Sequence, residues 1–220
     1  MKKEEYGGFM LSYPKSGRTW IKAFFVVYEV ITGLKKNILF KHKFNPDYGV
    51  MKRLLLVREP CDTLVSLYFH FTVRYGRNVG SIGSFARSKA PEMNDNLKAW
   101  MGMKQEVIKY EDLFLGAPVW KKILDWYGIR VVDTAVEEAD KACKFDNIRR
   151  DLTQFSGLKN SKKFLALEGK NITLTPNDPN AHKFRRGKVG GYVDYLDEED
   201  VAYIRERVPE ASRWYEGYNQ

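Results

Sequence analysis

Residues 9–20 have the sequence FMLSYPKSGRTW. The first three form a short apolar run, after which Pro14 and Gly17 interrupt any periodic pattern. From Trp20 onward, apolar residues recur every three or four positions as far as Gly33, a residue suited to ending a helix. The stretch therefore predicts a β-strand, then a loop, then an amphipathic helix whose apolar face carries Trp20, Phe24, Val27, Tyr28 and Ile31.

The same alternation of strand and helix continues along the chain. Residues 53–57, RLLLV, are typical of a parallel strand covered on both faces, and residues 106–110 predict a further strand. Periodicity and capping residues predict helices that begin at Glu59, Val119, Thr134 and Asp197 and end near Phe71, Tyr127, Asp151 and Arg207. We expect an α/β fold: one domain over residues 1–220, with a central, mainly parallel sheet between layers of helices.

Two polar segments predict loops. Residues 72–96 are rich in Gly, Ser, Arg and Asn with little periodicity, so we expect a long loop that offers contacts to an acceptor, with one short helix around Phe85. A helix at Leu97–Trp100 should follow. Residues 156–183 are polar and contain proline, which is the composition of a lid or loop.

The composition favours a folded protein that binds anions. The 220 residues are 44% hydrophobic and 14% aromatic, which excludes a disordered chain, and the formal net charge is +9. This surplus attracts nucleic acid, an anionic lipid surface or a small polyanion, without choosing among them. Cys61 and Cys143 match neither a disulfide framework nor a zinc motif, and no signal peptide or membrane span is expected, so the predicted location is cytoplasmic.

The loop over residues 12–19 has features of an anion-binding cradle. Compared with the phosphate-binding Walker A pattern, it has Ser12 in place of the first Gly and Arg18-Thr19 in place of Lys-[Ser/Thr]. It still combines a tight turn, the N-terminus of a helix and the cation Lys15, all of which favour phosphate binding. The alternative is an ordinary strand-to-helix turn with a surface lysine.

Three motifs together resemble the sulfotransferases that use 3′-phosphoadenosine 5′-phosphosulfate (PAPS). The family's nucleotide loop, near YPKSGTTW, is similar to YPKSGRTW at residues 13–20, with Arg18 as the one departure. A family motif with Arg and, eight positions later, Ser is similar to REPCDTLVSLYFHF at residues 58–71. An Arg-Lys-Gly run is similar to FRRGKVGG at residues 184–191. The resemblance covers most of the chain and implies a fold like that of the P-loop NTPases.

The resemblance implies which residues hold the nucleotide. PAPS is charged at its 5′ and 3′ ends, so its site needs two separated groups of cations or N–H donors, with an adenine platform between them. The family implies Lys15, Ser16, Gly17, Arg18 and Thr19 for the 5′ end, and Arg58, Ser66, Arg185, Arg186 and Gly187 for the 3′-phosphate. It implies Trp20, Phe145 and Tyr110 around the adenine, with core packing as the alternative for Trp20.

The resemblance also implies the general base. In relatives the base is a His between the first helix and the Arg-to-Ser motif, often in a Lys-x-His context, and His42 is the only His in that interval. Phe40 stands where the relatives have that Lys, so Lys41 and Lys43 are alternative bases.

The other histidines have structural interpretations, and no metal is expected. His70 is predicted to pack among aromatic residues, and His182 to lie in an exposed loop. With His42 as base, Lys15 would stabilise charge on the leaving 3′,5′-adenosine bisphosphate (PAP), and Ser66 is the third candidate catalytic residue.

Other functions stay open at this stage. A P-loop kinase or nucleotide hydrolase would share the sheet and loop, although the apolar run at residues 53–57 is followed by Arg58 where a Mg²⁺-binding acid would be expected. A nucleic-acid-binding module would use the net charge of +9, although no compact basic run with interleaved aromatic residues occurs. The acceptor, a small molecule or a sugar, is not identified. Residues 191–200 do not match the Lys-x-x-x-Thr-Val-x-x-x-Glu segment of dimeric relatives, so monomer and dimer also stay open.

Overall fold

Four parallel strands form the centre of the structure. The computed structural model describes residues 7–35, 37–42, 51–101, 105–144, 187–212 and 215. The strands lie in the order β2-β1-β3-β4 and comprise β1 (Gly8–Ser12), β2 (Ile38–Lys41), β3 (Lys52–Val57) and β4 (Glu106–Lys109). In β1, Phe9 lies opposite Leu39 on one side and Arg53 on the other. Because every pair is parallel, the strands end at the same edge of the sheet and the loops that follow them meet there.

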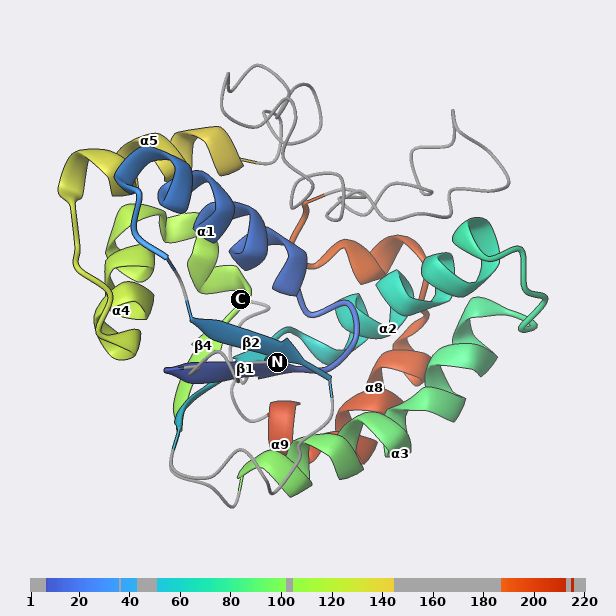
Figure 1. The fold of residues 1–220 in the computed structure, drawn as a ribbon. Helices are drawn as coiled ribbons and strands as arrows, with labels where there is room; N and C mark the ends of the chain where they lie inside the picture. Colours follow the sequence, from blue (N-terminus) through green and yellow to red (C-terminus); the bar gives the residue numbers. More distant parts are fainter. Residues whose placement is uncertain are drawn as a thin grey trace.

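Helices cover both faces of this sheet, as Figure 1 shows. One face carries α1 (Arg18–Thr32), α4 (Ala117–Tyr127) and α5 (Asp133–Cys143), and the other carries α2 (Pro60–Phe69), α3 (Ile82–Met101), α8 (Glu198–Arg207) and α9 (Pro209–Ser212). The described residues also include a π-helix, η2 (His70–Arg74), and two 3-10 helices, η3 (Glu111–Leu115) and η6 (Gly191–Asp194). This three-layer architecture confirms the predicted fold class.

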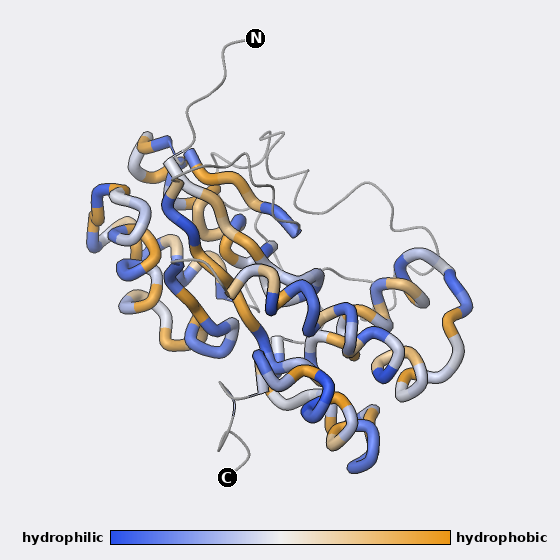
Figure 2. The backbone as a smooth tube through the Cα atoms, turned by 90° about the horizontal axis from the view of Figure 1, so that it is seen from below, coloured by the Kyte–Doolittle hydropathy of each residue, from blue (hydrophilic) through white to orange (hydrophobic). Residues whose placement is uncertain are grey.

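The side chains of the strands divide between two cores. Met10 of β1 packs with α1 and α4, whereas its neighbours Phe9 and Leu11 pack with α2 and α3 on the opposite face. All three side chains are fully buried, which is why the strand has an unbroken apolar sequence. Figure 2 colours the backbone by the hydropathy of each residue. Hydrophobic residues run along the strands, whereas hydrophobic and hydrophilic stretches alternate along the helices.

The first helix forms as its sequence predicts. α1 ends at Gly33, whose φ is +70° and whose N–H donates to the Glu29 carbonyl oxygen at 2.9 Å. On the buried face of α1, the Phe24 ring stacks on Trp120 of α4 with centroids 4.2 Å apart. The predicted capping of α8 is confirmed too, because the Asp197 side chain accepts the N–H of residue 200 at 2.7 Å.

The prediction of a long loop over residues 72–96 is wrong. Most of this stretch belongs to α3, in which Pro91 and many polar residues conceal a helical pattern. α3 packs against α2 and α8, and its buried residues have helical spacing: Phe85, Ala86, Ala90, Met93, Asn94, Leu97 and Trp100. Packing of this face outweighs the weak helix propensity of residues such as Gly83 and Pro91.

Other differences from prediction are smaller. The short strand β2 is not predicted from the sequence. α5 ends at Cys143, before the predicted Asp151, because Lys144 leaves the helical conformation with ψ of 143°. The predicted lid over residues 156–183 lies outside the described residues. Both cysteines are buried and free. No helix within the described ranges has both the length and the hydrophobicity that crossing a bilayer requires.

Candidate functional site

The loop between β1 and α1 is tightly folded. Lys15 has a left-handed backbone with φ of +73°, unlike every other non-glycine residue that the structure describes, and Gly17 follows with φ of +94°. The Ser16 N–H donates to the Tyr13 carbonyl oxygen at 3.3 Å, and the Trp20 N–H donates to the Gly17 carbonyl oxygen at 2.8 Å. A left-handed lysine is strained, and such strain concentrates at functional sites. The loop geometry therefore marks Lys15 as a candidate functional residue.

The N-terminus of α1 presents groups suited to an anion. Gly17 provides no side-chain cap, and the first turn of α1 contains no acidic residue. Ser16 is 1% exposed, and its hydroxyl has no hydrogen-bond partner among the described residues. Uncapped N–H groups and an unpaired buried hydroxyl both favour an anionic oxygen. The residues present therefore fit a phosphate or sulfate group beside Lys15.

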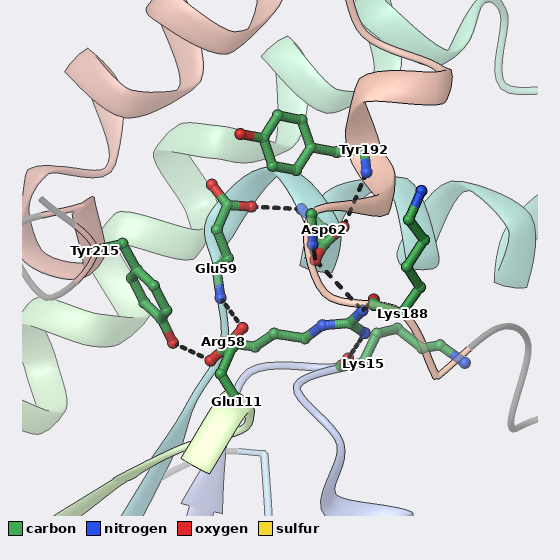
Figure 3. A network of polar contacts seen from close by, with 9 residues as sticks. Lys15, Arg58, Glu59, Asp62, Glu111, Lys188, Tyr192 and Tyr215 are labelled. Atoms are coloured by element: carbon green, nitrogen blue, oxygen red, sulfur yellow. Dashed lines mark hydrogen bonds and ion pairs between the residues drawn. The ribbon is translucent and has the colours of Figure 1, made fainter. Parts of the chain in front are cut away.

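Arg58, directly after β3, connects this loop to the C-terminal part of the chain (Figure 3). Its terminal nitrogens donate to the carbonyl oxygens of Lys15 at 3.3 Å and Lys188 at 3.5 Å. One of them lies 3.8 Å from the Asp62 carboxylate, and the guanidinium carbon lies 4.3 Å from the centre of the Tyr110 ring. Within the described chain its buried Nε has no hydrogen-bond partner. A buried guanidinium with an unused donor beside the loop is a candidate phosphate ligand.

Buried acids hold the turn that follows Arg58, as Figure 3 shows. The Glu59 carboxylate caps α2 by accepting the Asp62 N–H at 2.7 Å. Glu111 accepts the Glu59 N–H at 3.2 Å and the Tyr215 hydroxyl at 2.7 Å. Burial raises the pKa of Glu59 to about 7 and also raises the pKa of Glu111. These bonds fix the turn, and with it the position of Arg58.

His42 lies immediately after β2, at the same edge of the sheet. Its Nδ1 lies 2.8 Å from the Ser12 carbonyl oxygen, and its Nε2 contacts the Arg18 guanidinium. Burial, and after it the positive charge of Arg18, lowers the pKa of His42. Burial also lowers the pKa of Arg18, to about 10. The lowered pKa favours the neutral imidazole, which is the state that a general base needs.

Three aromatic side chains gather beside Gly17. Trp20 is 7% exposed and meets Tyr110 and Phe114 edge to face, with centroids 5.6 and 4.9 Å apart. A Cβ at Gly17 would lie 2.2 Å from the Tyr110 ring, so a larger residue cannot take this place without movement. Most of Trp20 is packed in the core, whereas Phe114 is 45% exposed. Phe114 is thus the most accessible of the three rings.

The structure brings most of the predicted site residues together at the carboxyl edge of the sheet. Those that meet there are Lys15, Ser16, Gly17, Arg18, Thr19, Trp20, His42, Arg58 and Tyr110. Ser66 is half-buried on α2. Gly187, with φ of +59°, directly precedes Lys188, whose carbonyl oxygen accepts a hydrogen bond from Arg58. Phe145, His182, Arg185 and Arg186 lie outside the described residues. His70 is half-buried with its ring 4.6 Å from that of Tyr75, which agrees with a packed histidine.

Sequence reasoning missed three residues beside the site. Glu59 and Asp62 look only like the acidic start of a helix, yet they bond to each other and to distant segments. Phe114 follows Tyr110 by four positions, so the helical spacing of two aromatic residues was the signal for it.

The sheet, the loop and the cationic residues define an α/β protein with a candidate anion-binding site at the carboxyl edge of a parallel sheet. The sulfotransferase domain family matches residues 49–213, and the chain belongs to this family. It is therefore a sulfotransferase, as the sequence predicts. A comparison with curated proteins gives no match. The family match favours a sulfotransferase over the kinase and nucleic-acid alternatives.

Solved structures share the fold. Mouse sulfotransferase SULT7A1 complexed with PAP has a TM-score of 0.72 at 17% identity, over 97% of this chain and 88% of that one. Retinol dehydratase has a TM-score of 0.65 at 14% identity, in a complex with androsterone and PAP and in another with retinol and PAP. These two matches cover 92% of this chain and 79% and 80% of the other.

Proposed function

We propose that this protein transfers the sulfuryl group of PAPS to a hydroxyl or amine of a small-molecule or sugar acceptor. The observation that carries the proposal is the junction of two anion-binding elements, in which the Arg58 guanidinium donates to the carbonyl oxygen of the strained Lys15. A nucleotide with charge at both ends needs two such elements side by side. The bound PAP in the similar SULT7A1 and retinol dehydratase structures supports the same donor class.

The nucleotide would lie across the carboxyl edge of the sheet. Its 5′ end would bind the N-terminus of α1, with Lys15, Ser16, Gly17, Arg18 and Thr19. Its 3′-phosphate would bind Arg58 and Ser66 together with Gly187 and, from outside the described residues, Arg185 and Arg186. Trp20, Tyr110 and Phe145 would surround the adenine, and the exposed ring of Phe114 adds a surface beside them. One domain over residues 1–220 and a cytoplasmic location stay part of the proposal.

The reaction would be an in-line transfer. The acceptor oxygen or nitrogen forms a bond to sulfur, while the bond from sulfur to the phosphate oxygen breaks. His42 takes the acceptor proton at Nε2, where the acceptor replaces the Arg18 guanidinium as the partner of this nitrogen, and its Nδ1 stays anchored on Ser12. Lys15 stabilises the charge that develops on the leaving phosphate, and Ser66 assists from α2. No metal ion is part of this mechanism.

An acceptor panel with isotopically labelled PAPS tests the activity. Phenols, alcohols, sugars and amines are each incubated with the enzyme, and sulfated product is measured by mass spectrometry. Lys15→Ala and His42→Ala should each lower turnover by about 100- to 1,000-fold while the fold persists. Lys98→Ala, at an exposed position on α3, is the matched control and should leave turnover unchanged. Full activity in His42→Ala would show that another residue is the base, and Lys41 and Lys43 would be tested next.

Thermal unfolding tests the donor class separately. PAP without metal should raise the melting temperature, because a ligand that binds only the folded state stabilises it. ATP with Mg²⁺ should raise it much less. The opposite order would favour a kinase, and no product together with no PAP binding would refute the proposal.

A further inference from the structure

The Asp62 carboxylate binds the backbone of a segment far along the chain. Its two oxygens accept the N–H groups of Gly190 at 2.8 Å and Tyr192 at 3.0 Å. Figure 3 shows the Asp62 side chain beside the backbone of Tyr192. Asp62 is 2% exposed, so these bonds are shielded from water. Hydrogen bonds from N–H groups to a buried carboxylate are shorter and stronger than those between neutral groups. Asp62 therefore fixes the backbone of residues 190–192 on α2.

The segment that Asp62 holds belongs to the candidate nucleotide site. Gly187 and Lys188 lie two to three residues before Gly190, and the Lys188 carbonyl oxygen accepts a hydrogen bond from Arg58 at 3.5 Å. Arg58 also donates to Lys15 of the first loop and lies 3.8 Å from Asp62 itself. Asp62 thus has two roles where Arg58 meets the C-terminal segment. It anchors the backbone of residues 190–192, and it orients the Arg58 guanidinium.

We propose that Asp62 is a positioning residue for donor binding, which holds Gly187 and Lys188 beside Arg58 and the Lys15 loop without contacting the nucleotide. This inference rests on the proposed function, because it assumes that PAP and PAPS bind at this junction. The Asp62 carboxylate oxygens already accept the N–H groups of Gly190 and Tyr192 and lie beside the Arg58 guanidinium. Asp62 therefore acts on the nucleotide through these groups. Loss of the anchor should weaken donor binding more than it slows the transfer step.

Asp62→Asn tests the proposal, because it keeps the size of the side chain and replaces one accepting oxygen with a donor. We expect the Kd for PAP, measured by calorimetry, and the KM for PAPS to rise about 10-fold or more, with kcat at saturating PAPS within about threefold of the wild type. Hydrogen exchange at the amides of Gly190 and Tyr192 should become faster. If Asp62→Asn does not fold, Asp62→Glu keeps the charge at a different reach and should raise the same Kd.

Asp200→Asn is the matched control. Asp200 is also a buried aspartate that joins the C-terminal part of the chain to another helix, through Arg87 of α3, but it makes no contact with the candidate site in the described structure. This variant should lower the melting temperature and leave the Kd for PAP unchanged. An unchanged Kd in Asp62→Asn, with normal PAP binding by the wild type, would overturn the inference alone. A wild type that binds no PAP would overturn the proposed function and this inference with it.

Discussion

The Nδ1 atom of His42 lies 2.8 Å from the carbonyl oxygen of Ser12. Because a carbonyl oxygen only accepts, Nδ1 carries the proton of the neutral ring, and Nε2 presents its lone pair to the Arg18 guanidinium. Arg18 is the one departure from the resembling nucleotide motif, which has Thr at that position. The contact therefore joins the proposed base, His42, to the one residue by which this loop differs from the family motif, Arg18.

Arg18→Thr should raise the pKa of His42. Burial is the largest cause that lowers this pKa, the Arg18 charge is the next, and Lys22 and Lys15 contribute less. Removing the Arg18 charge makes the imidazolium easier to form, so the acidic limb of the pH–rate profile should move to higher pH. An NMR titration of the His42 ring protons in the ligand-free protein measures the same change without turnover.

Lys22→Thr is the comparison variant for the effect of a nearby positive charge on the pKa of His42. It removes a cation from the same helix and should raise the pKa of His42 in the same direction, but by less than Arg18→Thr does. An identical His42 titration in the Arg18→Thr variant and the wild type would show that the guanidinium does not control the base.

Gly17→Ala should damage the nucleotide loop. The residue has φ of +94°, and an added Cβ would lie 2.2 Å from the Tyr110 ring, which is packed in the core. We expect a loss of about 2 kcal/mol or more in the free energy of unfolding, from backbone strain and overpacking together. PAP affinity should fall by about 10-fold or more, because the loop N–H groups move.

Gly33→Ala is the control for that variant. It has a similar φ of +70°, but nothing lies within 4 Å of an added Cβ. Only the backbone strain of about 1 to 2 kcal/mol should appear in denaturant unfolding, with PAP affinity unchanged. Equal effects of the two variants on PAP affinity would argue that the Gly17 loop is not a binding element.

Phe114→Ala should weaken PAP binding with little effect on folding. The ring is 45% exposed and lies against Trp20 and Tyr110, so it offers a stacking surface at small cost to the core. One lost base–aromatic contact corresponds to about 1 to 3 kcal/mol, which is a rise of about 5- to 150-fold in the Kd measured by calorimetry. Leu115→Ala, at 70% exposure on the next residue, should leave the Kd unchanged. Equal Kd values in the two variants would exclude Phe114 from the adenine site.

The sequence predicts those parts of the molecule that depend on local pattern. The strand and helix around the Lys15 loop, the strand before Arg58 and the Asp197 cap follow from spacing and capping residues, and the structure confirms them. α3 could not be found in this way, because its polar residues and Pro91 hide a face that packing against α2, α8 and α9 makes favourable. The bond from Asp62 to Gly190 is equally invisible, since nothing in either segment indicates the other.

Glu59 makes the stability of the fold depend on pH. Burial is the main cause that raises its pKa from 4.5 to about 7, so the folded state keeps the Glu59 proton over a range in which the unfolded state has lost it. This group therefore contributes stability that is fully present below about pH 4.5 and is lost as the pH rises through about 7. The free energy of unfolding that is lost in this way between about pH 4.5 and pH 8 is about 3 kcal/mol.

Glu59→Gln should remove this dependence. The amide oxygen of Gln can still accept the Asp62 N–H, which keeps the cap of α2, while no carboxylate has to ionise in the core. The variant should therefore gain stability relative to the wild type as the pH rises from 5 to 8, by about 1 to 3 kcal/mol in urea unfolding. Glu199→Gln, in which the side chain is 87% exposed, should show a difference from the wild type that varies by less than about 0.5 kcal/mol over the same range. A difference between Glu59→Gln and the wild type that is the same at pH 5 and pH 8 would mean that Glu59 ionises normally inside the folded protein.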